Sequence, residues 1–348
     1  MRADPSGAVE LGEAIGREPD ADRLWTRLLE GNAIVTGRLG VGKTTIARLA
    51  LTKAPDGWSA QLVELKSART GAEASAAVVE ALGSPGPMRS AVEAELARSS
   101  AGVVLILDDF DRWLQAASQA DATGFAEFTG TLASLCAADP KLRVVLISNT
   151  HLDRTLARLP PDPLLDLIEG CARIEVDPLS PDAGARLVMA LLLGESVTAQ
   201  DRAAVGRSLA AACDHVPRWI HCAVANLVTR RKPIVDDDLE RCMIEAVSDL
   251  ERLPWALRLE LAPVLDDYQQ PQRGLALSVL DQLALTEDEA LSFDDLRRQL
   301  AMEATIDDDA IERVLEQLRG DQLIREADGE LRFAGELLRA AWLKLRFL

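Results

Sequence analysis

The chain has 348 residues, more than one hydrophobic core usually accommodates, so we expect two or three domains. It is 48% hydrophobic and 27% charged, as an ordinary globular protein is. The net charge of −18 disfavours broad electrostatic binding to DNA, RNA or an anionic membrane, although a local basic patch stays open.

Cysteine and histidine positions argue against a metal centre or a disulfide framework. The five cysteines are scattered without a C-x-x-C pair, and the three histidines show no metal-ligand spacing. No apolar run approaches the roughly 18 residues of a membrane span, and residues 1–15 lack the apolar segment of a signal peptide. We therefore expect a cytoplasmic protein with reduced thiols and no membrane partner.

The first predicted elements are a helix, a short strand and a second helix. Apolar side chains recur at helical spacing over residues 24–29, and an apolar run follows at 33–35. This run ends in the stretch from Gly37 to Thr44, which fits G-x-x-x-x-G-K-[ST], the pattern of a phosphate-binding loop. A helical segment at 45–51 completes the order that the motif requires. The alternative is a glycine-rich turn that matches by chance.

Each residue type in this loop suits phosphate binding. Because glycine has no Cβ, the loop glycines let the backbone wrap closely around phosphate oxygens, with successive N–H groups pointing at the anion. Lys43 is expected to reach the β- and γ-phosphates of ATP, and the Thr44 hydroxyl to hold Mg²⁺. The residues expected to contact nucleotide here are Gly37, Gly40, Val41, Gly42, Lys43, Thr44 and Thr45.

Strands then alternate with helices up to about residue 178, which favours a parallel sheet with right-handed crossovers. The predicted strands are 61–65, 101–107, 143–148 and 172–176, and the predicted helical regions are 72–98, interrupted at 83–87, and 111–138. The fold class is therefore α/β, with the parallel sheet of a P-loop NTPase.

Polar residues follow two of the predicted buried strands. Asp108 and Asp109 end one of them, at the edge where open α/β sheets bind ligands. Asp108 is expected to hold Mg²⁺ through water and Asp109 to orient or deprotonate the attacking water. Asn149 ends the next strand and would hydrogen-bond a γ-phosphate oxygen or that water. Solvated turn residues are the alternative for all three.

From residue 179 onward the pattern is helical. Segments 181–194, 200–212, 217–230 and 236–250 suggest a small helical lid over 179–250. Pro217 begins one of these helices and is expected near the nucleotide, although it also suits a helix start for its own sake. Arg218 would sense the γ-phosphate from the lid. Arg154 and Arg158 are candidate arginine fingers or ordinary solvated helix residues.

Residues 251–348 predict a third domain after the nucleotide-binding domain (1–178) and the lid. Helical patterns at 274–285, 292–301 and 308–320 precede two short runs joined by Asp-Gly, a strong hairpin signal. Three helices and a hairpin describe a winged helix. This domain has 12 Lys and Arg against 21 Asp and Glu, a net charge of −9, so DNA binding is disfavoured and protein docking or autoinhibition fits better.

These motifs together resemble the STAND and initiator-like branches of the AAA+ P-loop ATPases. The resemblance rests on Gly16-Arg17-Glu18, the phosphate loop, Leu107-Asp108-Asp109, Ile147-Ser148-Asn149 and Pro217-Arg218, together with the terminal winged helix. It implies that Asn149 is the sensor-1 residue and Arg218 the sensor-2 arginine. Asp109 departs from the Asp-Glu pair of fast hydrolases, which implies slow turnover, and His215 stands where the lid motif of STAND proteins has glycine.

The resemblance implies an ATP-binding switch that hydrolyses ATP slowly and, with ATP and Mg²⁺, assembles with itself or engages a partner protein. STAND proteins usually carry an effector and a repeat sensor. This sequence shows neither, so we expect a separate protein to supply the output. An ATP-gated DNA-binding initiator or loader is the alternative, and a small-molecule kinase is a third reading that lacks a recognisable acceptor site.

Overall fold

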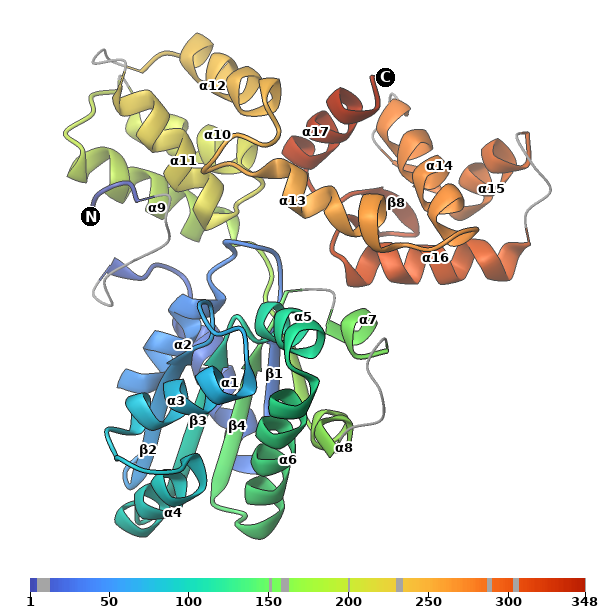
Figure 1. Ribbon diagram of the computed structural model, residues 1–348. Helices are drawn as coiled ribbons and strands as arrows, with labels where there is room; N and C mark the ends of the chain where they lie inside the picture. Colours follow the sequence, from blue (N-terminus) through green and yellow to red (C-terminus); the bar gives the residue numbers. More distant parts are fainter. Residues whose placement is uncertain are drawn as a thin grey trace. The chain divides into compact units, whose positions relative to one another are not determined.

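The computed structural model describes residues 1–4, 13–149, 152–157, 163–199, 201–229, 234–286, 290–302 and 307–347. The chain forms two compact units, each seen in Figure 1. The α/β unit comprises Glu10–Gly37 and Gly42–Asp177. The C-terminal unit comprises Met1–Val9, Arg38–Val41 and Pro178–Leu348, so the tip of the phosphate loop groups with it. The three domains expected from the sequence remain a prediction.

A five-stranded parallel sheet with the strand order β2-β3-β4-β1-β5 forms the centre of the α/β unit. Its strands are β1 (Ala33–Thr36), β2 (Trp58–Glu64), β3 (Gly102–Asp108), β4 (Leu142–Ile147) and β5 (Ala172–Glu175). All seven residues of β3 are buried, as expected for a central strand covered on both faces. The predicted α/β class and the parallel sheet are confirmed.

Strand β2 starts three residues earlier than its sequence pattern predicts. Trp58 pairs with Gly102 of β3, and its ring lies where a side chain at residue 102 would be. It also meets Trp25 edge-on, with ring centroids 6.0 Å apart. This tertiary packing extends the strand beyond the segment of alternating residues. Sequence periodicity alone cannot predict such an extension.

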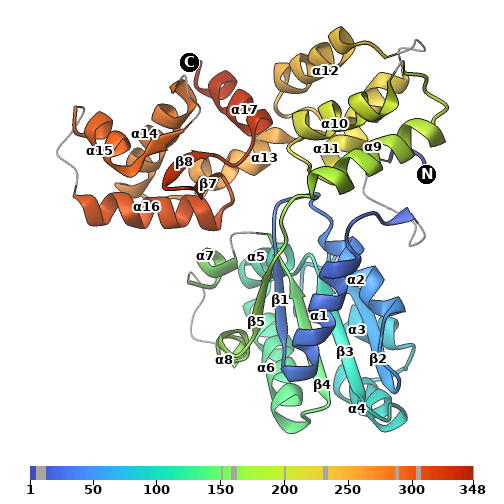
Figure 2. The same cartoon turned by 180° about the vertical axis from the view of Figure 1, so that it is seen from behind.

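Helices cover both faces of the sheet (Figures 1 and 2). One face carries α1 (Glu18–Glu30) and α2 (Lys43–Thr52), which pack against each other. The helices that share the core of the other face are α3 (Gly71–Leu82), α4 (Met88–Arg98), α5 (Phe110–Ala120), α6 (Ala122–Ala138), α7 (Leu152–Ala157) and α8 (Pro163–Glu169).

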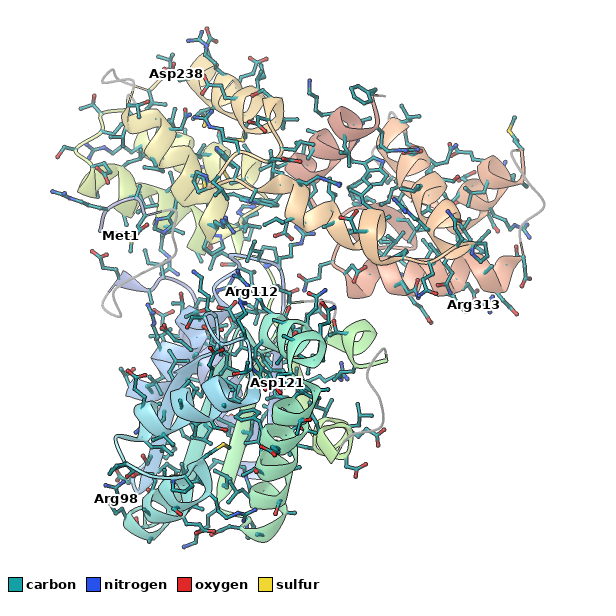
Figure 3. All side chains as sticks on the ribbon, viewed as in Figure 1. Met1, Arg98, Arg112, Asp121, Asp238 and Arg313 are labelled. Carbon is teal, nitrogen blue, oxygen red and sulfur yellow. The ribbon has the colours of Figure 1, made fainter. Side chains whose placement is uncertain are left out.

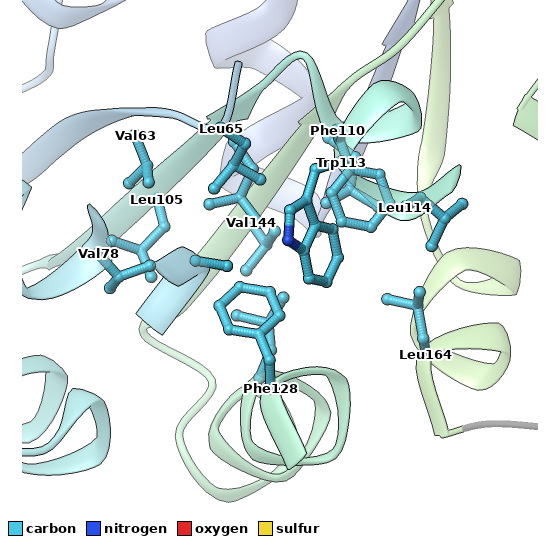
Figure 4. Close-up of a cluster of buried hydrophobic side chains, with 14 of the residues drawn as sticks. Val63, Leu65, Val78, Leu105, Phe110, Trp113, Leu114, Phe128, Val144 and Leu164 are labelled. Atoms are coloured by element: carbon cyan, nitrogen blue, oxygen red, sulfur yellow. The ribbon is translucent and has the colours of Figure 1, made fainter. Parts of the chain in front are cut away.

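Trp113 of α5 lies at the centre of the core on this second face (Figure 4). Its side chain is fully buried and contacts the rings of Phe110, Phe125 and Phe128, whose centroids lie 5.6, 5.6 and 4.9 Å away. Aromatic contacts of this kind add to the burial of apolar area. The cluster fixes α5 and α6 to the sheet directly beyond the end of β3.

In the C-terminal unit, four helices come first, as the sequence predicts: α9 (Pro181–Gly194), α10 (Arg202–Ala212), α11 (Pro217–Val228) and α12 (Asp236–Ser248). The further helices are α13 (Leu257–Ala262), the π-helical turn η2 (Pro263–Asp267), α14 (Gln272–Leu285), α15 (Phe293–Ala301), α16 (Asp308–Gly320) and α17 (Glu336–Arg346). Sequence periodicity did not reveal α13 or η2, which are one or two turns long.

A small antiparallel sheet of order β6-β8-β7 packs against the helices α14–α16. Its strands are β6 (Leu291–Ser292), β7 (Ile324–Ala327) and β8 (Glu330–Phe333). The turn between β7 and β8 has positive φ at Asp328 (56°) and Gly329 (80°), as a tight Asp-Gly hairpin requires, so the predicted hairpin is confirmed. The two-residue β6 is too short to show alternation. The assignment as a winged helix remains a prediction.

Within the described ranges, no helix combines the length and the apolar character that crossing a membrane would need.

Candidate nucleotide-binding site

The phosphate loop connects β1 to α2, as predicted. Gly42 caps the N-terminus of α2 in the left-handed region, with φ 110°, and Gly40 has φ 75°. Residues with a Cβ rarely adopt this backbone conformation. A Cβ at Gly42 would also lie 3.1 Å from Nε of Arg17. The positive φ therefore favours glycine at residue 42, and the Arg17 side chain would have to shift slightly for any larger residue. Thr45 lies in the first turn of α2, and Val41 is fully buried.

Lys43 supplies the ammonium group of this loop. Its Nζ donates to the carbonyl oxygen of Gly37 at 2.7 Å and to Oδ1 of Asn149 at 3.0 Å. The side chain is 9% exposed, although it carries a charge. Strands β1 and β4 are neighbours, which brings the start of α2 and Asn149 together as the sequence analysis expected.

Thr44 and Asp108 form the second contact of the site. The Thr44 hydroxyl donates to Oδ2 of Asp108 at 2.7 Å, and Asp108 is buried at the end of β3. A hydroxyl and a carboxylate are hard oxygen donors of the kind Mg²⁺ prefers, and Mg²⁺ commonly takes only one or two protein ligands beside phosphates and water. The described residues contain no cluster of three His, Cys, Asp or Glu side chains suited to a metal. This pair fits Mg²⁺ held jointly with a nucleotide.

Asp109 follows in the left-handed conformation, with φ 56°, and caps α5. Its own N–H donates to Oδ1 of Asp108 at 3.0 Å. Burial raises the pKa of the Asp109 carboxyl, the neighbouring carboxylates of Asp108 and Asp111 raise it further, and Arg112 and Lys66 oppose them. Arg112 is exposed on α5 and is labelled in Figure 3. A carboxyl with a raised pKa is a better proton acceptor once it is ionised.

Arg17 is a site neighbour that residue-based reasoning missed. It is 5% exposed, pairs with Asp20 at 2.9 Å, and donates through Nη2 to the carbonyl oxygen of Asp177 at 2.8 Å. Desolvation lowers its pKa, and the hydrogen bond to Asp20 opposes this. Its side chain lines Gly42. The only sequence signal was its place in Gly16-Arg17-Glu18, and this motif does not indicate where Arg17 lies relative to the phosphate loop.

Pro217 occupies the first turn of α11, where its fixed φ suits the helix start. The Arg218 N–H donates to the carbonyl oxygen of Gly40 at 3.2 Å, within the C-terminal unit. Its Nε donates to the carbonyl oxygen of Pro254 at 2.9 Å. Arg218 thus lies against the loop tip, while its role as a γ-phosphate sensor remains a prediction. The side chain of Arg154 in α7, and Arg158 altogether, lie outside the described residues.

Sequence comparison places this geometry in a known family. A family model described as an AAA domain matches residues 27–156, which contain the phosphate loop and the ends of β3 and β4. Residues 27–156 are an AAA domain. The five-stranded parallel sheet, to which residues 27–156 contribute β1 to β4, has the P-loop AAA+ fold.

Solved structures resemble the chain over nearly its whole length. The Walker-type ATPase PABY2304 of Pyrococcus abyssi has 16% identity and a TM-score of 0.65, covering 94% of this chain and 96% of its own. The ORC2 protein of Aeropyrum pernix, in ADPNP–ADP complexes, has 15% identity and a TM-score of 0.52, covering 95% and 93%. At these identities the likeness shows a shared fold and nothing further. No curated protein matches the sequence.

Proposed function

We propose that this protein is an ATP-binding and slowly ATP-hydrolysing molecular switch of the AAA+/STAND type. The observation that carries the proposal is the Thr44–Asp108 hydrogen bond beside Lys43, at the carboxyl edge of the sheet in an AAA domain. A hydroxyl, a carboxylate and an ammonium at this edge of the sheet are the groups that bind magnesium and phosphate in P-loop NTPases.

The residues divide the work as follows. Lys43 neutralises phosphate charge, and Thr44 and Asp108 hold Mg²⁺, which polarises the phosphoryl oxygens when bound. Asp109 accepts a proton from the attacking water, and Asn149 orients that water through its carboxamide. In the structure Oδ1 of Asn149 accepts a hydrogen bond from Nζ of Lys43, which places both side chains at the proposed phosphate site. Arg218, against the carbonyl of Gly40, would register the nucleotide from α11.

The proposed output is nucleotide-dependent self-assembly or engagement of a partner protein in the cytoplasm. Fast AAA+ hydrolases usually carry glutamate at the position that Asp109 resembles. The aspartate here favours a long-lived ATP-bound state over rapid turnover. Within the described residues the five cysteines form no disulfide, in keeping with a reducing compartment.

Isothermal titration with Mg-ATP tests the nucleotide-binding part, and no detectable binding would contradict it. Light scattering of the full chain without nucleotide, with Mg-ADP and with a slowly hydrolysed ATP analogue tests the switch. Growth in mass with the analogue alone would support assembly. An unchanged mass in all three states would exclude self-assembly and leave partner engagement as the output.

A DNA-binding initiator or loader is the second candidate, because α14–α16 and the β7–β8 hairpin have the order of a winged helix. The charge opposes it. The first turn of α16 carries Asp308 and Asp309, and Arg313 one turn later is exposed (Figure 3). A titration with duplex DNA at several salt concentrations separates the candidates, since phosphate contacts weaken steeply with salt.

A further inference from the structure

Arg38 occupies a position in the phosphate loop where the motif specifies no side chain. In G-x-x-x-x-G-K-[ST], the residue after the first glycine is unrestricted, because backbone N–H groups contact the phosphates. Arg38 is nevertheless only 3% exposed. A buried guanidinium is costly unless other groups hydrogen-bond it or balance its charge, so the fold has a specific place for this side chain.

That place is the turn between α16 and β7. The Arg38 N–H donates to Oε1 of Gln322 at 3.2 Å, and Nη2 of Arg38 donates to the carbonyl oxygen of the same residue. Both contacts lie within the C-terminal unit, to which Arg38–Val41 belongs. The backbone and the side chain of one loop residue are therefore both held by one turn residue, although 284 positions separate them in the sequence.

The turn that holds Arg38 is itself fixed from both sides. Asp321 closes α16, and its Oδ2 accepts a 2.7 Å hydrogen bond from the hydroxyl of Tyr268, the only tyrosine in the chain. Gln322 follows with φ 55°, and its N–H donates to the carbonyl oxygen of Arg319 at 2.8 Å. Tyr268, Asp321 and Gln322 are all buried, so the turn is a rigid anchor.

Nearby carboxylates offset part of the cost of burying this guanidinium. Desolvation lowers the pKa of Arg38, the carboxylates of Glu260 and Asp214 counteract this, and Arg325 adds to it. Asp214 also accepts from the N–H groups of Glu336 and Leu337 at 2.7 and 3.2 Å, at the start of α17. The loop tip therefore shares an electrostatic environment with the start of a helix in the same unit.

The loop tip has a second attachment two residues further on. The Gly40 carbonyl accepts from the N–H of Arg218 at 3.2 Å, and a Cβ at Gly40 would lie 2.3 Å from Cβ of Arg218. Within the tip, the Val41 N–H donates to the Arg38 carbonyl at 3.3 Å. A loop held at residues 38 and 40 has less freedom than a free glycine-rich loop, and a preorganised cradle binds its ligand more tightly.

We propose that Arg38 is a positioning residue of the nucleotide site, and that the α16–β7 turn, through Gln322, holds the tip of the phosphate loop and slows nucleotide release. The inference rests on the proposed nucleotide binding and adds a means of regulating it. Any partner that displaces this turn would free the loop tip and accelerate exchange of ADP for ATP.

Stopped-flow displacement of a fluorescent ADP analogue (mant-ADP) from the full chain tests this. Arg38→Ala and Gln322→Ala each remove one of the two contacts and are expected to release mant-ADP about tenfold faster than wild type, as for the loss of one buried hydrogen bond of about 1.4 kcal/mol. Gln322→Glu keeps an acceptor oxygen at the same reach and is expected to restore slow release. Arg207→Ala, at an exposed arginine of α10, is the matched control and should release at the wild-type rate.

The outcomes are distinguishable. Wild-type binding of mant-ADP with unchanged release from both alanine variants would overturn the positioning role alone. No binding by wild type would overturn the proposed function and this inference with it. Should Arg38→Ala fail to fold, the comparison of Gln322→Ala with Gln322→Glu decides, because a purely structural defect would not be rescued by restoring one acceptor oxygen. Equal release from those two variants would then count against the proposal.

Discussion

The hydroxyl of Thr44 donates a 2.7 Å hydrogen bond to Oδ2 of Asp108, which joins the first turn of α2 to the end of β3 across 64 positions of sequence. The bond depends on the sheet order, because β3 reaches the phosphate loop only through β4 and β1. Asp108 is buried, so its carboxylate has a fixed direction. The two proposed magnesium-holding oxygens are thus in place together.

Asp108→Asn tests the magnesium assignment. The carboxamide keeps the shape and an acceptor for the Thr44 hydroxyl, but it removes the negative charge that favours a divalent cation. We expect ATP affinity in the presence of Mg²⁺ to fall by about tenfold or more, toward the value measured with EDTA, while affinity in EDTA changes little. Isothermal titration calorimetry under both conditions measures this. A variant whose ATP affinity depends on Mg²⁺ as strongly as that of wild type would exclude Asp108 as a magnesium ligand.

Lys43→Ala tests the phosphate cradle. Its ammonium lies between the carbonyl of Gly37 and Oδ1 of Asn149, and no other cation of the loop is expected to reach the β- and γ-phosphates. We expect the variant to show no ATP binding at concentrations that saturate wild type. Wild type at about a thousand times its Kd should gain roughly 4 kcal/mol of stability, seen as a raised Tm that Lys43→Ala lacks.

Lys141→Ala, at an exposed lysine before β4, is the matched control for this variant and should keep both binding and the ligand-induced rise in Tm. Tight ATP binding by Lys43→Ala would instead show that the cradle lies elsewhere.

Local patterns predicted where the phosphate loop and the strand ends lie, because these features follow from local rules. Gly42, Lys43 and Thr44 form one contiguous motif, and Asp108 ends a continuous apolar run, so each could be recognised without tertiary information. The parallel sheet then brings the strand ends together, which is why Asn149 was expected near the loop and lies against Lys43.

Residues whose roles depend on long-range packing escaped the sequence analysis. Arg38 looks like any unrestricted loop residue, and only the folded chain places it against Gln322. Arg17 lines Gly42 because α1 packs on α2, which helical periodicity alone does not orient toward the loop. The π-helical turn η2 lacks a sequence period of its own, so the segment between α12 and α14 had no predicted structure.

Asp109→Asn tests the proposed base. The change preserves the side-chain shape and the left-handed turn, which Asn tolerates as well as Asp does, but removes the proton acceptor. We expect nucleotide binding to persist and steady-state phosphate release to fall by about a hundredfold or more. Because burial and the adjacent carboxylates raise the pKa of Asp109, wild-type hydrolysis should decline on the acid side at a pH above the ordinary aspartate range. Unchanged turnover would exclude Asp109 as the base.

Trp113→Ala tests the packing that supports the end of β3. Trp113 is fully buried among three phenylalanines, and its Nε1 donates to the carbonyl oxygen of Thr70 at 3.3 Å. Removing the ring leaves a cavity, so the free energy of unfolding should fall by about 3–5 kcal/mol. Trp113→Phe should cost less because it retains most of the volume. Urea titration monitored by far-UV circular dichroism measures both, and equal stabilities would contradict the packing argument.

Asp214→Asn tests the buried carboxyl at the start of α17. Desolvation raises the pKa of Asp214 to about 6, and Arg38 and the backbone N–H groups of α17 offset only part of this effect. A carboxyl whose folded-state pKa lies above its ordinary value of 3.8 binds more protons when folded, so its contribution to stability falls as pH rises from about 4 to about 6 and is constant above. The full change is on the order of 3 kcal/mol.

Asparagine at this position cannot titrate, so the difference in unfolding free energy between wild type and Asp214→Asn isolates the group. We expect this difference to shift against wild type between pH 4 and pH 6, by an amount on the order of 3 kcal/mol, and to level off by pH 7. Urea titrations of both proteins at intervals across this range measure it. A difference that stays constant with pH would mean that the carboxyl titrates alike in the folded and unfolded chains, and that its hydrogen bonds to Glu336 and Leu337 offset its burial in full.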